Sequence, residues 1–440
     1  MYKNYFMNIT FLNHASYILE SENTKILFDP YLYGTAFNNS WKLFNEEKHD
    51  LSDINYIFFS HEHPDHFQVD FIKNHFNERR DEITILYQET YDKRVKTFCS
   101  KLGYNFLELP NYKETLLEND LKITLGKVPF YDSWVMVSNS ENNILNVNDC
   151  VLEDPSLVHT IKKISGDSKI DVLLTQFSYA GFADYQHRSI NAKSQLETIK
   201  LQDTILKPKN IIPFASFIYF AHKESFYMND FINTPEITET FLKNNISGNT
   251  IWLKPNEKWK VNEKKDNHTS IAYWMQFYNN INSLPKVDPG ESVNILELEK
   301  KYQKYITRIK SKNNRFLLSI YNIALGKYVN MHLYDIDTFI KINLLTGLTT
   351  LQNKPENFIK LHSETLAFVF DFDFGIDTFS VSARFESDAE LFNRFCQSFA
   401  IGELNNTGKY LKFSDFYKFF QQGIFKRLIN FITLGPGNKK

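Results

Sequence analysis

The sequence has few of the residues that mark disulfide-stabilised, fibrous or disordered chains. It holds only three cysteines in 440 residues, Cys99, Cys150 and Cys396. The number is odd and the positions lie far apart, so we expect no disulfide framework, and a reducing cytoplasm fits. The 15 glycines and 13 prolines are also too few for a fibrous or disordered chain.

An excess of charge of one sign and long apolar runs are missing as well. The 50 basic and 52 acidic residues give a formal net charge of −2, so no overall field favours nucleic acid as a partner. No run approaches the roughly 18 apolar residues of a membrane span, and the first residues lack the features of a signal peptide. We therefore expect a cytoplasmic location, no membrane span and no nucleic-acid partner.

Aromatic and aliphatic side chains are plentiful instead. The chain has 40 Phe and 24 Tyr, and 42% of its residues are hydrophobic, which is enough for a large core. Short apolar strands alternate with helical segments over residues 1–265. This alternation predicts a layered α/β catalytic domain.

The second half of the sequence has a different character. Residues 266–295 are polar and contain two prolines, so we expect a linker there. Residues 296–440 predict a C-terminal α+β domain that covers the active site or mediates homo-oligomerisation. Within it, residues 365–385 predict a strand pair around Gly375, because Phe368, Phe370, Phe372 and Phe374 alternate. Residues 414–432 predict a basic amphipathic helix.

A cluster of potential metal ligands follows the short apolar strand at residues 55–59. His61 and His63 are two positions apart, so they point the same way in an extended segment and can hold one divalent cation. Asp65 and His66 follow in the turn and can reach a second cation. Imidazole and carboxylate suit zinc, manganese or iron, so we expect one or two such ions as cofactor.

The pattern His-X-His-X-Asp-His after a strand resembles the signature of the metallo-β-lactamase superfamily. Asn13-His14-Ala15 and Phe28-Asp29-Pro30 resemble the strands that precede it there. The resemblance implies an αβ/βα sandwich with the metals at one edge, between two sheets. Residues 144–150 and 213–222 extend the similarity, over about residues 8–260, to the catalytic region of CMP-N-acetylneuraminate hydroxylase and its bacterial relatives.

Carried over residue by residue, this resemblance makes the four cluster residues ligands and adds two others. Asp149 matches the metal-bridging carboxylate, although an Asn-Asp turn after a strand would look the same. His222 matches a late histidine that serves as a ligand or as a hydrogen-bond donor to the transition state, with an ordinary strand-end histidine as the alternative.

One departure from the superfamily concerns the histidine that usually lies about twenty residues before the bridging aspartate. Asp132 lies in this region instead. It either substitutes as a ligand, or the second metal binds more weakly, or a single metal binds. His14 is expected at the same edge of the sheets and can assist, and Asp29 is the candidate that orients the ligand imidazoles.

Four further residues are candidates for contact with the substrate. Gln176 and Tyr179 follow a buried strand and either line the pocket or belong to a plain turn. His187 and Arg188 can contact an anionic group, or lie in a solvated loop.

The first functional hypothesis is a metal-dependent hydrolase of a phosphorylated, nucleotide-activated or lactone-type small molecule. The metal lowers the pKa of bound water to ~7, Asp65 orients that water, and His222 or Tyr179 stabilises the oxyanion. The alternative is an iron-dependent oxygenase acting on a nucleotide sugar. It needs an external electron donor such as a partner reductase, because no cysteine here has a histidine within three residues, as a Rieske cluster requires. A non-catalytic interaction protein is a third hypothesis, against which the intact ligand motif argues.

Overall fold

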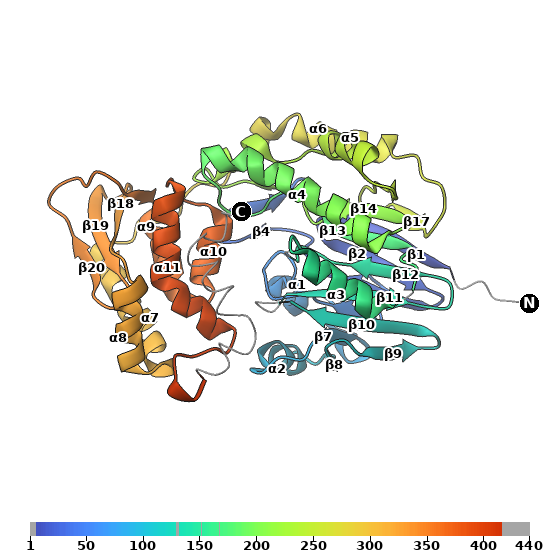
Figure 1. Cartoon of the computed structure of the whole chain (residues 1–440), viewed down its shortest axis with the longest axis horizontal. Coiled ribbons are helices and arrows are strands. Elements are labelled where there is room, and N and C mark those ends of the chain that lie inside the picture. Colours follow the sequence, from blue (N-terminus) through green and yellow to red (C-terminus); the bar gives the residue numbers. More distant parts are fainter. Residues whose placement is uncertain (1–5, 129–131, 151, 167, 416–440) are drawn as a thin grey trace, which may run out of the picture.

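The computed structural model describes residues 6–128, 132–150, 152–166 and 168–415. Two seven-stranded sheets lie face to face, with helices on their outer sides and a separate helix-rich region at one end (Figure 1). From residue 416 onward, the helix expected over residues 414–432 lies outside the described residues.

The first sheet begins with antiparallel hairpins and continues with parallel strands. Its strands, in spatial order, are β17 (Lys258–Lys260), β1 (Met7–Asn13), β2 (Ser16–Ser21), β3 (Thr24–Phe28), β6 (Tyr56–Phe58), β7 (Thr84–Gln88) and β8 (Asn105–Leu109).

The second sheet is antiparallel on one side and parallel on the other. Its order is β16 (Asn249–Thr250), β14 (Asn210–Phe214), β13 (Val172–Gln176), β12 (Asn143–Asn146), β11 (Ser133–Ser138), β10 (Leu121–Lys127) and β9 (Glu114–Glu118).

Side-chain alternation explains why the first sheet can be covered on both faces. In β3, Ile26 and Phe28 enter the core between the two sheets, whereas Leu27 between them enters the core on the other face. Successive side chains of a strand point to opposite faces, so a continuous apolar run fills two cores at once.

The outer helices complete the layers. Helices α1 (Val69–Asn74) and α2 (Arg94–Lys101) pack on the first sheet. Helix α4 (Tyr185–Leu206) contacts β13 of the second sheet and lies beside α3 (Pro155–Ser165) and α5 (Pro235–Asn245). The expected αβ/βα sandwich is confirmed. No helix in the described part of the chain combines the length and apolar character needed to cross a membrane.

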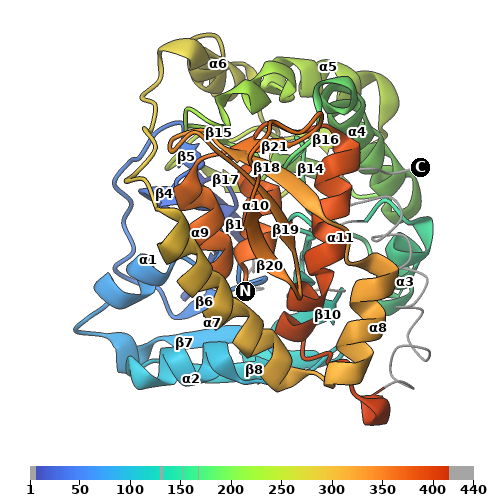
Figure 2. The ribbon, with the colours of Figure 1, turned by 90° about the vertical axis from the view of Figure 1, so that its left-hand side faces the viewer.

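The C-terminal region is a four-stranded sheet surrounded by helices, which confirms the α+β extension (Figure 2). The strands, in spatial order, are β20 (Gly347–Thr350), β19 (Thr338–Asn343), β18 (Val329–Leu333) and β21 (Ile359–Leu361). The helices are α7 (Ile295–Lys312), α8 (Arg315–Leu325), α9 (Ser363–Asp371), α10 (Gly375–Ser382) and α11 (Ala389–Asn406).

A second hydrophobic core joins this region to the sandwich. Tyr31, Trp41 and Phe220 from the first half of the chain share it with Phe379 and Phe395. Trp41 and Phe220 belong to a small sheet of β15 (Ile218–Phe220), β5 (Trp41–Leu43) and β4 (Thr35–Ala36). The C-terminal region is therefore packed on the sandwich through a shared apolar core.

The strand pair expected over residues 365–385 is wrong, because this segment forms helices α9 and α10. The imidazole of His362 caps α9 by accepting a hydrogen bond from the amide of Glu364, at 3.2 Å. Phe370 is buried while Phe372 is exposed, so the regular phenylalanine spacing spans a helix end and a turn. The alternation imitates a strand period without a strand being present.

The segment expected to be a linker, residues 266–295, also contains a helix. Helix α6 covers His268–Tyr278, and its Trp274 is fully buried, stacked on Phe217 at 3.9 Å between ring centroids. The polar residues and the two prolines that follow the helix, over residues 279–295, dominated the composition of the segment and hid it. The domain boundaries themselves stay a prediction.

Candidate metal centre

The histidine cluster lies at one edge of the first sheet because two parallel strands end there together. Strands β3 and β6 are parallel neighbours, with Phe28 opposite Phe58. The chain then continues into Asp29 and Ser60. The Ser60 amide donates to the Asp29 carboxylate at 2.7 Å, and the Ser60 hydroxyl donates to the other oxygen at 2.8 Å. This fixes the start of the His61–His66 loop against β3.

Asp29, the candidate for orienting the ligand imidazoles, contacts the ring of His66. Its Oδ2 lies 3.0 Å from Nδ1 of His66. This leaves Nε2 of His66 directed towards Asp65, at 3.3 Å, and Asp149, at 3.6 Å. A carboxylate bound to one ring nitrogen fixes the tautomer that presents the other nitrogen to a metal.

One group able to hold a cation consists of His61, His63 and Asp149, whose ligand atoms all lie within 4.8 Å of one another. Nε2 of His61 is 3.7 Å from Oδ2 of Asp149. Burial lowers the pKa of His61 to about 3, so its ring is neutral near pH 7. A neutral imidazole is the form that binds metals.

A second group lies beside it and consists of His14, Asp65 and His66, all buried. His14 is placed by the turn between β1 and β2, and its Nε2 is 3.1 Å from Oδ2 of Asp65. The structure thus brings His14 into the cluster, as expected from the N-terminal hairpin.

Asp132 and Asp149 reach the cluster from the second sheet. Asp132 precedes β11, and Asp149 follows β12, the antiparallel neighbour of β11. Oδ1 of Asp132 lies 3.5 Å from Nδ1 of His61. Burial, together with the nearby Asp149 carboxylate, raises the pKa of Asp132 to about 8. A carboxyl in this state needs a cation before it can ionise readily near pH 7.

The unsatisfied atoms of the cluster fit a metal centre. Nε2 of His61 and one carboxylate oxygen each of Asp65 and Asp149 are buried without a hydrogen-bond partner among the described residues. Buried polar atoms are rarely left in this state, and divalent cations would use their lone pairs. Imidazole and carboxylate donors are suited to zinc, iron or manganese.

Two residues expected to stabilise an oxyanion lie elsewhere. The Tyr179 hydroxyl donates to the backbone carbonyl of Met228. His222 belongs to another cluster, in which Nδ1 accepts from the Glu224 amide at 3.2 Å, and it is in neither cation-binding group. Both side chains thus have local partners, and their expected roles stay a prediction.

Three substrate candidates have mainly structural contacts. His187 lies beside Asp184 at the start of α4, with 2.5 Å between Nδ1 and Oδ1. Arg188 is buried and donates to the carbonyl of Tyr227 at 2.7 Å. Gln176 lies close to the cluster, since its backbone N–H donates to the backbone carbonyl of Asn148, the neighbour of Asp149, at 3.3 Å.

The sequence did not indicate one residue of the cluster, Asp377. Its Oδ2 lies 2.9 Å from Nε2 of His63, although 314 positions separate the two residues. Burial alone would lower the pKa of His63, but the Asp377 carboxylate outweighs it and raises the pKa to about 9. No local motif surrounds Asp377, so only the packing of α10 reveals it.

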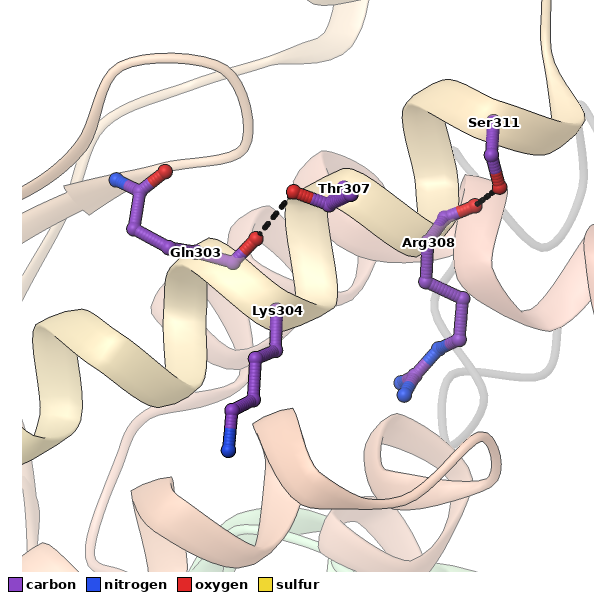
Figure 3. A pocket seen from close by; sticks show the side chains of 5 residues that line it. All are labelled: Gln303, Lys304, Thr307, Arg308 and Ser311. Carbon is purple, nitrogen blue, oxygen red and sulfur yellow. Dashed lines mark hydrogen bonds between the residues drawn. The ribbon is translucent and has the colours of Figure 1, made fainter.

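A surface hollow on α7 does not take part in this chemistry (Figure 3). It is lined by Gln303, Lys304, Thr307, Arg308 and Ser311. Its hydroxyls bond within the helix, Thr307 to the carbonyl of Gln303 and Ser311 to that of Arg308. None of the cluster residues contributes to it.

Comparison with known families agrees with the geometry. Residues 8–214 match the model of the β-lactamase superfamily domain. The chain is related to the metallo-β-lactamase superfamily. Known relatives include the cytidine monophosphate-N-acetylneuraminic acid hydroxylase of Danio rerio, with 25% identity over 51% of this chain and 40% of that protein. A protein of Mycolicibacterium smegmatis named as a Rieske 2Fe-2S iron–sulfur protein is 28% identical over 40% of this chain and 35% of its own length. The chain therefore spans well under half of these two relatives.

Solved structures similar to this metallo-β-lactamase relative include two different kinds of enzyme. CmlA, a diiron β-hydroxylase from Streptomyces venezuelae, has a TM-score of 0.41 and 12% identity, over 59% of this chain and 55% of its own. An isothiocyanate hydrolase from Delia radicum gut bacteria has a TM-score of 0.41 and 16% identity, over 58% of this chain and 99% of its own.

Proposed function

We propose that the chain is a metal-dependent oxygenase that hydroxylates an anionic small molecule, such as a nucleotide sugar, at a pair of iron ions. The observation that carries this proposal is the carboxylate of Asp132, 3.5 Å from His61, where the superfamily usually has a histidine. With Asp65 and Asp149, it makes the donor set rich in carboxylates. Such mixed histidine and carboxylate sets are typical of non-haem iron and di-iron proteins.

The proposed ligand roles follow from position. His61 and His63 would hold one ion, Asp65 and His66 the second, and Asp149 would bridge them, with Asp132 next to the first and His14 next to the second. When bound, the iron pair supplies the activation of O₂. Asp29 keeps the His66 ring in place through its 3.0 Å contact.

Hydroxylation needs electrons from outside the chain. One atom of O₂ enters a C–H bond and the other leaves as water, which takes up two electrons and two protons from a donor. The described cysteines are buried, and none lies near a histidine in sequence. The expected electron donor therefore lies outside these 440 residues, for example on a reductase.

The second candidate function is the hydrolase, which one observation favours: these 440 residues contain no Rieske motif. The metals would then activate water, with its proton passing to Asp65. Less in its favour, the Tyr179 hydroxyl donates to the Met228 carbonyl and Nδ1 of His222 accepts from the Glu224 amide.

Metal loading and oxygen consumption test the proposal. The metal-free full-length protein is given an equimolar mixture of Fe²⁺ and Zn²⁺ without oxygen, and the bound metals are measured. The iron-loaded protein is then exposed to O₂ with a chemical reductant and CMP-sugars. We expect two irons per chain and reductant-dependent oxygen uptake. Preferential zinc binding, with hydrolysis of phosphodiesters or lactones and no oxygen uptake, would establish the hydrolase instead.

The variant Asp132→His tests the residue on which the proposal rests. It restores the donor usual in the superfamily, so the ratio of bound iron to bound zinc should fall roughly tenfold, which corresponds to ~1.4 kcal/mol. The matched control is Asp53→His, an exposed aspartate paired with Lys25, which should leave the ratio unchanged. An unchanged ratio in Asp132→His would contradict a role for this carboxylate in metal choice.

A further inference from the structure

We propose that Asp377, supplied by the C-terminal region, orients His63 as a metal ligand, so that residues from both halves of the chain build the metal centre. This inference rests on the proposed metal site but not on oxygen chemistry. It assigns a function to a region whose role the sequence leaves open. Asp377 acts through His63 and is a positioning residue.

Asp377 contacts Nε2 of His63, which leaves the other ring nitrogen, Nδ1, available to bind a metal. Oδ2 of Asp377 lies 2.9 Å from Nε2 of His63, while no hydrogen bond among the described residues involves Nδ1 of this ring. Histidines that bind metal through one nitrogen almost always donate the other N–H to a carboxylate, a carbonyl or water. Asp377 therefore selects the tautomer with Nδ1 free for a cation shared with His61 and Asp149.

The position of Asp377 is fixed by the elements around it. Its backbone amide donates to Oε1 of Glu403 on α11, at 3.3 Å. Gly375 begins α10, and its Cα lies so close to the carbonyl of Val369 in α9 that an added Cβ would come within 2.3 Å of the oxygen. The tight turn between α9 and α10 thus sets the angle at which Asp377 approaches the loop. In Figure 1, α10 lies on the side of the C-terminal region that faces the sandwich.

A second contact holds the same loop at Glu62, the residue before His63. The carboxylate of Glu62 lies 2.9 Å from Nε of Arg94. Arg94 in turn donates to the carbonyl of Asn406 on α11, at 3.3 Å, and lies over the ring of Phe374, 4.6 Å from its centroid. Two consecutive residues of the ligand loop are therefore anchored to the C-terminal region. This second anchor distinguishes the contact between His63 and Asp377 from an isolated ion pair on the surface.

Binding of Co²⁺ to the metal-free protein tests the assignment, because its visible absorption reports ligand geometry. Asp377→Asn keeps the size of the side chain and removes its charge. We expect Co²⁺ to bind 10–100-fold more weakly, the usual cost of losing such a partner, with an altered absorption band. Asp377→Glu, which restores the carboxylate, should recover part of the affinity.

The matched control is Asp373→Asn, which removes a neighbouring aspartate paired with Arg308 on α7, at 2.7 Å. It should bind Co²⁺ like the original protein. Thermal unfolding of the metal-free variants verifies that both fold. Original affinity and an original spectrum in Asp377→Asn would overturn the assignment. Failure of the original protein to bind Co²⁺, Zn²⁺ or Fe²⁺ would instead refute the metal centre itself, so the two failures are distinguishable.

Discussion

At the scale of single residues, burial and charge act in opposite directions on neighbouring side chains. His61 and His63 are two positions apart, yet burial lowers the pKa of the first to about 3, while Asp377 overcomes burial and raises that of the second to about 9. Burial prevails at His61 despite the carboxylates of Asp132 and Asp149 nearby, whereas the closer Asp377 carboxylate prevails at His63. At neutral pH the His61 ring is therefore neutral, while the His63 ring is held as a cation beside Asp377.

The same physics makes His222 a determinant of acid stability. Burial lowers its pKa from 6.5 to about 3, and the charge of Arg384 adds to this effect. Between these values the unfolded chain binds a proton that the folded chain does not, so the free energy of unfolding decreases as the pH falls from 6.5.

Replacing His222 with Gln removes this titration. We expect the dependence of the unfolding free energy on pH, measured by urea denaturation between pH 4.5 and 6.5, to become shallower by up to ~1.4 kcal/mol per pH unit. The exposed His268 provides the control, since His268→Gln should keep the original slope. Equal slopes in all three proteins would contradict the explanation.

The candidate site could be predicted from the sequence as far as its ligands are contiguous. His61, His63, Asp65 and His66 form one motif after one strand, and a strand and its exit loop have a simple geometry. Asp377 could not be predicted, because its place depends on the packing of α10 against a distant loop. The positions of Tyr179 and His222 also depend on tertiary partners that a linear pattern does not contain.

At the scale of elements, the turn between α9 and α10 does not tolerate an added side chain at Gly375. The Gly375 position has no room for a side chain, because the Val369 carbonyl oxygen would be 2.3 Å from a Cβ. Backbone atoms cannot move aside as flexible side chains can. The alternating phenylalanines nearby predicted strands, and this error arose because a period of two can be produced by a helix end followed by a turn.

The variant Gly375→Ala should therefore unfold more easily, with the free energy of unfolding reduced by about 1–3 kcal/mol. Because α10 has to shift, the affinity for Co²⁺ should fall as well. Gly290→Ala is the comparison, since its new methyl group would meet only the carboxyl end of Glu364, at 3.0 Å. A stability loss in Gly290→Ala equal to that in Gly375→Ala would argue against the role of the turn.

At the scale of the whole molecule, a buried arginine joins the two halves of the chain. The Arg384 side chain is fully buried. Its guanidinium lies 2.9 Å from Glu224 and 3.0 Å from Glu364, and it donates to the carbonyl of Asn38 at 2.8 Å. Asn38 and Glu224 belong to residues 1–265, and Glu364 belongs to the C-terminal region.

Removing this side chain leaves the buried carboxylate of Glu224 and the partly exposed carboxylate of Glu364 without their counter-charge. We expect Arg384→Ala to lower the free energy of unfolding by about 3–5 kcal/mol, the usual cost of breaking a buried ion pair. Arg394→Ala breaks an exposed pair with Glu390 and should cost at most about 1 kcal/mol. Chemical denaturation of both variants measures the difference, and similar losses would refute the special role of the buried pair.

The second hydrophobic core has a consequence for how small molecules enter. Its aromatic side chains come from both halves. Separating the halves would therefore expose a large apolar area to water, at a free-energy cost of roughly 25 cal/mol for each Å². A small molecule can reach the histidine cluster without separation of the halves, because the His63 side chain keeps 33% of its surface accessible and that of Asp149 keeps 20%.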